Sequence, residues 1–325
     1  MRTGRCAIRD ADRAAGPSSQ VRAMLRYTLR QLEYFVTTAE CGSIAKAAAR
    51  LNVSQPSVSV AVSKLEQQFG LELFVRHHAQ GVSLTRPGHR LVVEARDMLR
   101  HARQIQQNAE ASGSVVGGEI ELACFSTFAP LFVPELVARF RERYPAVRFN
   151  LQEGLQHTLV AGLLSGRFEL ALLYDRELPE EIVVERLASF QPYALLPERH
   201  PLAAKKSVSL ASLKDEPYIL LDIPPSRGFF LEIFRRSGIE PKIAFSSPSI
   251  EMVRGLVGQG QGFSLLVTHP HFDRTYDGKV IATRPLVQQT IAGDICLARL
   301  RQARPTRLMQ LFRDFCKDWF VRYTD

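Results

Sequence analysis

Apolar residues in the first part of the chain recur every three or four positions, which is the spacing of helices with one buried face. The spacing predicts three helices, at about 29–41, 44–51 and 55–69, with Ser43 and Ser54 as N-caps of the second and third. A tight turn joins the second and third helices, and the third begins with small polar residues. This arrangement favours a helix-turn-helix, although an ordinary helical hairpin with the same caps is an alternative.

The third helix and the segment after it hold the side chains expected to contact DNA. A helix-turn-helix presents the N-terminal residues of its second helix to base edges in the major groove, where Gln can bond adenine twice. Two short strands, at 73–76 and 82–85, predict a hairpin wing with a basic and polar tip suited to phosphates or a minor groove. The predicted DNA-contacting residues are Ser43, Ser54, Gln55, Pro56, Ser57, Ser59, Ser63, Lys64, Arg76, His77 and His78.

A longer helix is predicted at about 88–111, with Thr85 as its cap. Its apolar positions step by four and three residues, as in a coiled coil, and predict packing against the same helix of a second copy. A dimer would match a two-fold operator, whereas packing on the chain's own domain is the alternative. The apolar positions are Leu91, Ala95, Met98, Ala102, Ile105 and Ala109, and the small residues Ser112, Gly113, Ser114, Gly117 and Gly118 predict a flexible hinge after them.

Beyond the hinge the pattern changes to alternating strands and helices, which predicts an α/β domain with crossover connections. The predicted strands are 120–125, 147–152, 169–174, 193–196, 218–221, 243–246 and 263–267, and helices are predicted near 133–144, 158–165, 226–237 and 249–258. Ligands of such sheets bind beyond the carboxyl ends of the strands, where helix N-termini supply donors.

Hydroxyl and charged side chains cluster at these strand ends and helix starts. The hydroxyls favour an anion, Arg227 offers a bidentate partner for a carboxylate, and Asp175 suggests a zwitterionic or hydroxylated acid. Taken singly, several of these residues have an ordinary role as N-caps, so the prediction depends on their convergence. The predicted effector-binding residues are Ser126, Thr127, Tyr174, Asp175, Ser226, Arg227, Ser247, Ser249 and Glu251.

Charge and cysteine content sharpen this picture. The net charge of +9 is uneven, because residues 1–90 hold 13 Lys/Arg against 6 Asp/Glu while the rest of the chain is nearly neutral, which indicates a polyanion-binding first module. The five cysteines are widely spaced and lack a CxxC motif, which predicts free thiols in a reducing compartment and no metal site. No apolar run approaches the ~20 residues of a membrane span, and residues 1–24 lack the apolar core of a signal sequence. We expect a cytoplasmic protein without a cofactor or membrane contact, with a disordered extension at 1–24.

The run from Leu29 to Gly88 resembles the DNA-binding domain of the LysR-type transcriptional regulators. The matching positions are Phe35, Ala39-Glu40-x-Gly42-Ser43, Ala47-Ala48-x-x-Leu51, Ser54-Gln55-Pro56-Ser57-Val58-Ser59, Leu65-Glu66, Leu73-Phe74-x-Arg76 and Leu84-Thr85-x-x-Gly88. One departure is Val60-Ala61, where family members often carry Arg or Gln. Base recognition is therefore expected to depend more on Gln55, Ser57 and Lys64.

The later region resembles the effector domain of the same family, a two-lobed α/β fold related to periplasmic binding proteins. The matching positions are Thr127, Pro134, Phe140, Tyr144-Pro145, Glu153-Gly154, Leu163, Gly166, Glu169-Leu170-Ala171 and Gly260-x-Gly262-Phe263-x-Leu265-Leu266. The predicted domains are a winged helix-turn-helix at 25–88, a linker helix at 89–112, a hinge at 113–118, lobe I at about 119–190 and 270–325, and lobe II at about 191–269. The resemblance implies a homodimer, commonly a tetramer, that binds operator DNA. It also implies that an effector closing the lobes rotates the DNA-reading heads and changes contact with RNA polymerase.

Three other functions are weighed against this prediction. An enzyme is disfavoured because the chain has no GxSxG, HExxH or phosphate-loop motif, and the glycines at 258–262 follow a helix, the reverse of a dinucleotide-binding turn. A secreted binding protein is disfavoured by the basic first module. Redox sensing through Cys124 requires a thiol of lowered pKa and a resolving partner, and it is the alternative to ligand sensing.

Overall fold

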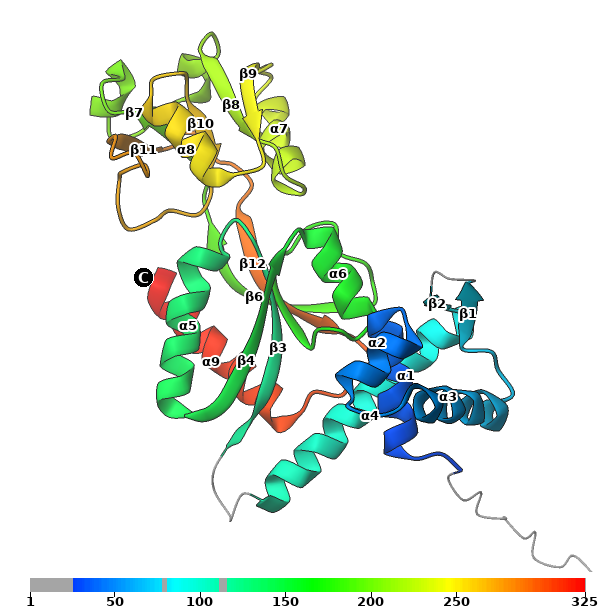
Figure 1. The fold of residues 1–325 in the computed structure, drawn as a ribbon. Helices are drawn as coiled ribbons and strands as arrows, with labels where there is room; N and C mark the ends of the chain where they lie inside the picture. Colours follow the sequence, from blue (N-terminus) through cyan, green and yellow to red (C-terminus); the bar gives the residue numbers. More distant parts are fainter. Residues whose placement is uncertain (1–25, 78–80, 111–115, 325) are drawn as a thin grey trace, which may run out of the picture.

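The structure is a computed structural model that describes residues 26–77, 81–110 and 116–324 of the chain. Figure 1 shows a helical module packed around one end of the long helix α4 (Arg86–Glu110), and two further lobes that follow it in the chain. Several predictions fall outside the described residues. They concern the extension at 1–24, His78 of the wing, and Ser112, Gly113 and Ser114 of the hinge.

The first module has the predicted helix-turn-helix with a wing. Helices α1 (Leu29–Cys41), α2 (Ile44–Arg50) and α3 (Gln55–Phe69) each begin at a side-chain cap, from Thr28, Ser43 and Ser54 respectively. Strand β1 (Phe74–His77) pairs antiparallel with β2 (Gly81–Leu84), so the wing lies one residue nearer its tip than predicted on both strands. The core of the module includes Leu32, Phe35, Val36, Ala47, Ala48, Val58, Val62, Leu65 and Leu73.

Helix α4 begins two residues before its predicted start, and the Thr85 hydroxyl accepts the Gly88 N–H at 3.0 Å, as a cap does. Its apolar residues divide between two faces. Val92, Ala95 and Leu99 are buried in the core of the first module, because α4 covers α1. The prediction that Ala95 belongs to a seam for a second copy is therefore wrong. Met98 and Ile105 stay 42% and 71% exposed, on a face that the chain itself leaves uncovered.

Lobe I is a five-stranded sheet with the strand order β4-β3-β5-β12-β6. Strand β3 is parallel to both β4 and β5, whereas β12 returns from the end of the chain and is antiparallel to β5 and β6. Gly117 and Gly118 belong to β3 and not to a hinge. The elements of lobe I are β3 (Gly117–Phe125), α5 (Ala129–Arg143), β4 (Ala146–Gly154), α6 (Gln156–Leu164), β5 (Leu170–Tyr174), β6 (Ile182–Phe190), β12 (Gly293–Leu300) and α9 (Arg307–Thr324).

Lobe II holds two smaller sheets, β10-β7-β11 and β8-β9, which are joined where Tyr218 bridges to Phe263. Strand β11 pairs with β7, so lobe II extends past the predicted boundary at residue 269, and the chain returns to lobe I only at β12. The elements of lobe II are β7 (Tyr193–Pro197), η1 (Pro201–Ala204), η2 (Leu210–Leu213), β8 (Pro217–Leu221), α7 (Ser226–Arg236), β9 (Lys242–Ser247), α8 (Ile250–Gly258), β10 (Ser264–Leu266) and β11 (Ile281–Pro285).

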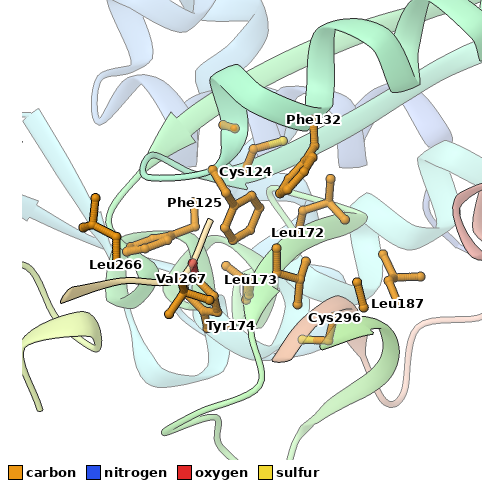
Figure 2. Close-up of a cluster of buried hydrophobic side chains, with 14 of the residues drawn as sticks. Cys124, Phe125, Phe132, Leu172, Leu173, Tyr174, Leu187, Leu266, Val267 and Cys296 are labelled. Carbon is orange, nitrogen blue, oxygen red and sulfur yellow. The ribbon is translucent and has the colours of Figure 1, made fainter. Parts of the chain in front are cut away.

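The two lobes meet where the strands of lobe I end. Figure 2 shows Tyr174, at the end of β5, beside Val267, which follows β10 of lobe II, and both side chains face the same cavity. Behind them the core of lobe I continues through Phe125, Phe132 and Leu172. Within the described part of the chain, no helix is both long enough and apolar enough to cross a membrane.

Candidate DNA-binding surface and effector cavity

Helix α3 separates a buried face from an exposed polar face. Val58, Val62 and Leu65 point into the core, because they repeat at spacings of four and three. The exposed residues of the other face include Gln55, Pro56, Ser57, Ser63 and Lys64, while Ser59 is half-buried. The predicted DNA-contacting side chains of α3 are thus available to a partner, and Val60 lies among them at 53% exposure.

Two of the predicted serines, Ser43 and Ser54, accept backbone N–H groups at the starts of helices. The Ser54 hydroxyl lies 2.7 Å from that of Ser57 and accepts the Ser57 N–H at 3.3 Å, while Ser43 accepts the Lys46 N–H at 3.5 Å. Ser43 and Ser54 therefore cap their helices as predicted. Their contact with DNA remains a prediction.

The wing is attached to α3 by side-chain contacts. The Glu66 carboxylate accepts the N–H groups of Leu73 and Phe74 at 2.9 and 3.3 Å, and Arg76 donates to the Ser63 hydroxyl at 3.5 Å. Arg76 therefore lies next to the exposed face of α3. The other predicted wing residue within the described residues, His77, has a ring nitrogen 2.7 Å from the Ser83 hydroxyl.

A cavity that is partly open to solvent lies between the two lobes, and the empty space in it and in its open mouth is about 390 Å³. Lobe I contributes a residue that follows β3, the end of β5 and the start of β12. Lobe II contributes the ends of β8 and β10 and the starts of α7 and α8. The lining residues are Thr127, Tyr174, Arg176, Leu221, Pro225, Ser226, Phe229, Phe230, Ile250, Leu266, Val267, Thr268 and Gly293.

Three predicted effector-binding residues, Thr127, Tyr174 and Ser226, line this cavity. The Thr127 hydroxyl is buried and makes no well-formed hydrogen bond within the described residues, although it lies beside the Tyr174 phenol. Burial raises the pKa of Tyr174 to about 12, and the Thr127 and Thr268 side chains lower it by less. Neither Thr127 nor Ser226 caps a helix, because α5 and α7 have Phe128 and Pro225 at their N-cap positions.

Arg176 is the one charged residue among those that line the cavity, and it was not among the residues predicted from the sequence. Its guanidinium lies 5.1 Å from the ring centre of Phe229 in the opposite lobe, and it makes no ion pair with a described carboxylate. A planar cation on an aromatic ring keeps its edge free for an anion. Its position directly after β5, beside Asp175, was the signal that could have identified it.

The other predicted effector-binding residues have different surroundings. Arg227 is 48% exposed and donates to Asp222 at 2.8 Å, so its charge is already paired. Ser249 caps α8 by accepting the Met252 N–H, and Ser247 accepts the Ser249 N–H. None of these residues lines the cavity, nor do Ser126, Asp175 and Glu251, of which Asp175 lies 4.0 Å from Arg186 and Glu251 lies 3.4 Å from Arg254.

The cysteines of the effector domain are enclosed. Cys124, Cys296 and Cys316 are all buried, and each lies in a core of apolar side chains. Burial raises the pKa of all three thiols, that of Cys296 to about 12, and neighbouring acidic groups add to the effect for Cys124 and Cys296. Reactive thiols have the opposite shift.

A helix-turn-helix with a wing, followed by a two-lobed α/β domain with a cavity between its lobes, defines a class of DNA-binding proteins that also have a domain for a small molecule. A family model for the LysR substrate binding domain matches residues 113–321, and one for the bacterial regulatory helix-turn-helix protein of the lysR family matches residues 29–89. The chain belongs to the LysR family, and it is a transcription regulator with a DNA-binding domain and an effector-binding domain.

Similar proteins support the same assignment. HinK, a LysR family transcriptional regulator from Pseudomonas aeruginosa, is 48% identical in its crystal structure, with a TM-score of 0.62 over 90% of this chain and 99% of HinK. The uncharacterized HTH-type transcriptional regulator YvbU of Bacillus subtilis is 31% identical over 74% of this chain and 81% of its own length. The DNA-binding transcriptional dual regulator OxyR of Escherichia coli is 28% identical over 73% of this chain and 78% of its own length. The family consists of transcription regulators, which are not enzymes.

Proposed function

We propose that this regulator responds to a small organic anion, a carboxylate with an apolar body, that binds between the lobes of the effector domain. The observation that carries the proposal is that two residues line the same cavity. One is Arg176, the one charged lining residue, and the other is Thr127, whose buried hydroxyl lacks a well-formed hydrogen bond. A buried hydroxyl without a well-formed hydrogen bond is costly, so a ligand oxygen that reaches it is favoured. The apolar walls, which include Phe229, Phe230 and Leu266, suit an aliphatic or aromatic body.

The same lining argues against other ligand classes. An ammonium group would meet Arg176 without a carboxylate among the lining residues to offset the repulsion. The zwitterionic ligand suggested by Asp175 also loses support, because that carboxylate does not line the cavity. A ligand that touches both lobes changes the lobe arrangement only by binding one arrangement more tightly than the other.

The DNA-binding part of the proposal concerns residues and assembly. Gln55, Ser57 and Lys64 on the exposed face of α3 are proposed to contact operator DNA, with Arg76 contacting the backbone beside them. A second copy is proposed to cover the exposed side of α4 at Met98 and Ile105. Assembly into a tetramer and contact with RNA polymerase are carried over from the family and remain proposals for this chain.

Redox sensing receives less support. OxyR is a related protein, and the name of one matched relative, from another strain of Escherichia coli, is hydrogen peroxide-inducible genes activator. In this chain, however, burial raises the pKa of the Cys124, Cys296 and Cys316 thiols, which disfavours the reactive thiolate form. The observations on this chain therefore favour ligand sensing.

Thermal unfolding of the full chain, with and without small carboxylic acids, amino acids and polyamines, tests the proposal. A ligand present at a hundred times its dissociation constant stabilises the folded state by about 2.7 kcal/mol. We expect carboxylic acids to raise the unfolding temperature, and Arg176→Met to abolish the increase. Arg141→Met, which removes an exposed arginine on α5, is the control and should leave the increase intact. Stabilisation by polyamines, or by acids equally in wild type and Arg176→Met, would contradict the proposal.

A further inference from the structure

We propose that helix α6 and strand β5 form a rigid connection between the effector cavity and linker helix α4, with Gln156 as the positioning residue at the cavity end and Arg96 and Arg100 as the contacts at the linker end. The inference takes one point from the proposed function, namely that a ligand binds in the cavity. The connection itself is argued from contacts within the chain.

At the cavity end, Gln156 holds the turn that lines the cavity. It is the first residue of α6 and is 5% exposed. Its side-chain oxygen accepts the Tyr174 N–H at 3.2 Å, and its side-chain nitrogen donates to the Arg176 carbonyl at 2.6 Å. One buried amide thus bonds the backbone at both ends of the turn that presents Tyr174 and Arg176. A shift of this turn requires α6 to move with it, or two buried hydrogen bonds to break.

At the other end of α6, two arginines of α4 bond the carbonyls of the two residues that follow the helix. Arg96 donates to the Ser165 carbonyl at 2.5 Å, and Arg100 donates to the Gly166 carbonyl at 3.1 Å. Cations are favourable at the C-terminal end of a helix. Gly166 has a φ of +68°, and a side chain there would approach the backbone of Val93, so α4 and this turn lie in close contact.

Strand β5 makes the same connection beside α6. Glu169, which directly precedes β5, lies 3.2 Å from the Arg100 guanidinium, while Tyr174 at the other end of the strand lines the cavity. Helix α6 also packs tightly against the segment that leads into β5. Gly162 of α6 faces the ring of Phe168, two residues before β5, so closely that no side chain would fit between them. Packed elements of this kind move as one body, because interiors are dense and have few alternative arrangements.

The linker end also reaches the DNA-binding module. Besides its bond to lobe I, the Arg96 guanidinium lies 3.2 Å from the Glu40 carboxylate at the end of α1. The other oxygen of Glu40 lies 3.0 Å from Arg50, the last residue of α2 in the helix-turn-helix. The contacts therefore continue from the turn at Arg176, through α6 and Arg96, to the helices that carry the DNA-binding surface.

Amide hydrogen exchange of the full chain, without any ligand, tests the connection from both ends. The measured quantity is the exchange rate at the far end divided by the rate in β7, which lies in lobe II outside the connection, so that a general loss of stability cancels. Arg100→Met should raise this ratio in peptides that cover 174–178, and Gln156→Met should raise it in peptides that cover 96–106. Couplings of about 1–3 kcal/mol correspond to changes of about fivefold or more. Arg103→Met, an exposed arginine on the same helix, is the control and should change neither ratio.

The outcomes separate this inference from the proposed function. Far-end ratios that stay within the error of the Arg103→Met control would overturn the connection, even where carboxylic acids bind the cavity. A ratio that rises for one variant but not the other would also overturn it, because energetic coupling between two sites is reciprocal. Raised ratios in both directions support the connection, including in the case where no carboxylic acid binds.

Discussion

In the helix-turn-helix module, the residues proposed to contact DNA lie on an exposed helix face, whereas those proposed to contact an effector surround a cavity inside the second domain. The interior of the first module is apolar, and within residues 26–77 no buried side-chain nitrogen or oxygen lacks a hydrogen bond. The effector domain differs, because the Thr127 hydroxyl is buried there without a well-formed hydrogen bond.

The difference shows how much each kind of binding site lowers the stability of the fold. A surface that contacts DNA needs side chains that the fold does not use, so changing them leaves stability nearly unchanged. A cavity that recognises a ligand keeps polar atoms away from water and incompletely bonded, which lowers stability until the ligand binds. Four substitutions test this contrast.

Glu66→Ala should lower stability the most of the four substitutions. It removes two hydrogen bonds inside the first module and leaves the DNA-facing side chains of α3 in place. The Glu66 carboxylate accepts two backbone N–H groups at the start of the wing, and leaving both without a partner is expected to lower the free energy of unfolding by about 2–5 kcal/mol. Denaturant unfolding of the full chain measures this loss. Glu66→Gln keeps one acceptor oxygen and should lose less. A loss below about 1 kcal/mol for Glu66→Ala would mean that solvent replaces these bonds.

Glu169→Gln should change the pH dependence of stability. Burial raises the pKa of Glu169 from 4.5 to about 7, and Glu121 and Asp97 add to this, while Arg100 opposes it. Between these values the folded state holds a proton that the unfolded state has released. The free energy of unfolding is therefore unaffected by this titration below pH 4.5. It falls by about 3 kcal/mol as the pH rises from 4.5 to 7.

Unfolding measured from pH 4.5 to 8 should show this decline in the wild type and a smaller decline in Glu169→Gln. Glu119→Gln, at an exposed position of β3, is the control and should keep the decline. Identical slopes for wild type and Glu169→Gln would place the titration elsewhere. They would also weaken the contrast between the two domains, because the buried Glu169 carboxylate would then not lower the free energy of unfolding of the effector domain.

Gln55→Ala tests the exposed side of the comparison. We expect a loss of about 1–3 kcal/mol in binding to a DNA site selected from a random library, with relaxed preference at one adenine, and an unchanged free energy of unfolding. Lys64→Ala should instead weaken binding to all sequences and reduce the salt dependence by about one ion. Titrations at several salt concentrations distinguish the two. Equal losses on all sequences for Gln55→Ala would assign it to the phosphate backbone.

The first module was predictable from sequence almost to the residue, because its signals are local. Ser43 and Ser54 each precede a run of helical spacing and cap the helix that follows. The spacing also places Val58, Val62 and Leu65 on the buried face of α3, although Phe69, at the next position of that spacing, is 36% exposed. The wing strands were each misplaced by one residue. At the start of β1, the Leu73 and Phe74 N–H groups bond to Glu66 of the neighbouring helix α3, a contact that the strand pattern does not show.

The cavity was only partly predictable, since its residues come from strands far apart in the chain. The rule that ligands bind beyond strand ends identified Thr127, Tyr174 and Ser226. It could not show that Asp222 pairs with Arg227, which leaves Arg176 as the charged lining residue. Strands β6, β11 and β12, and helix α9, were not delimited from the sequence. The boundary of lobe II was therefore drawn before β11, although that strand pairs with β7.

Thr127→Val is the most direct test of the contrast, although its expected effect is the smallest. Valine keeps the shape of threonine and removes the hydroxyl that lacks a well-formed hydrogen bond, so the free energy of unfolding without ligand should stay constant or rise by up to about 1 kcal/mol. Thr38→Val is the matched control in the first module, where the buried hydroxyl donates to the Tyr34 carbonyl at 2.7 Å. That substitution should lower stability by about 1 kcal/mol. Thr127→Val should also lose stabilisation by carboxylic acids, since the ligand oxygen would then lack its partner. Equal losses of stability for the two variants would mean that the Thr127 hydroxyl is fully hydrogen-bonded without a ligand. The cavity would then lower the free energy of unfolding no more than the exposed surface of α3 does.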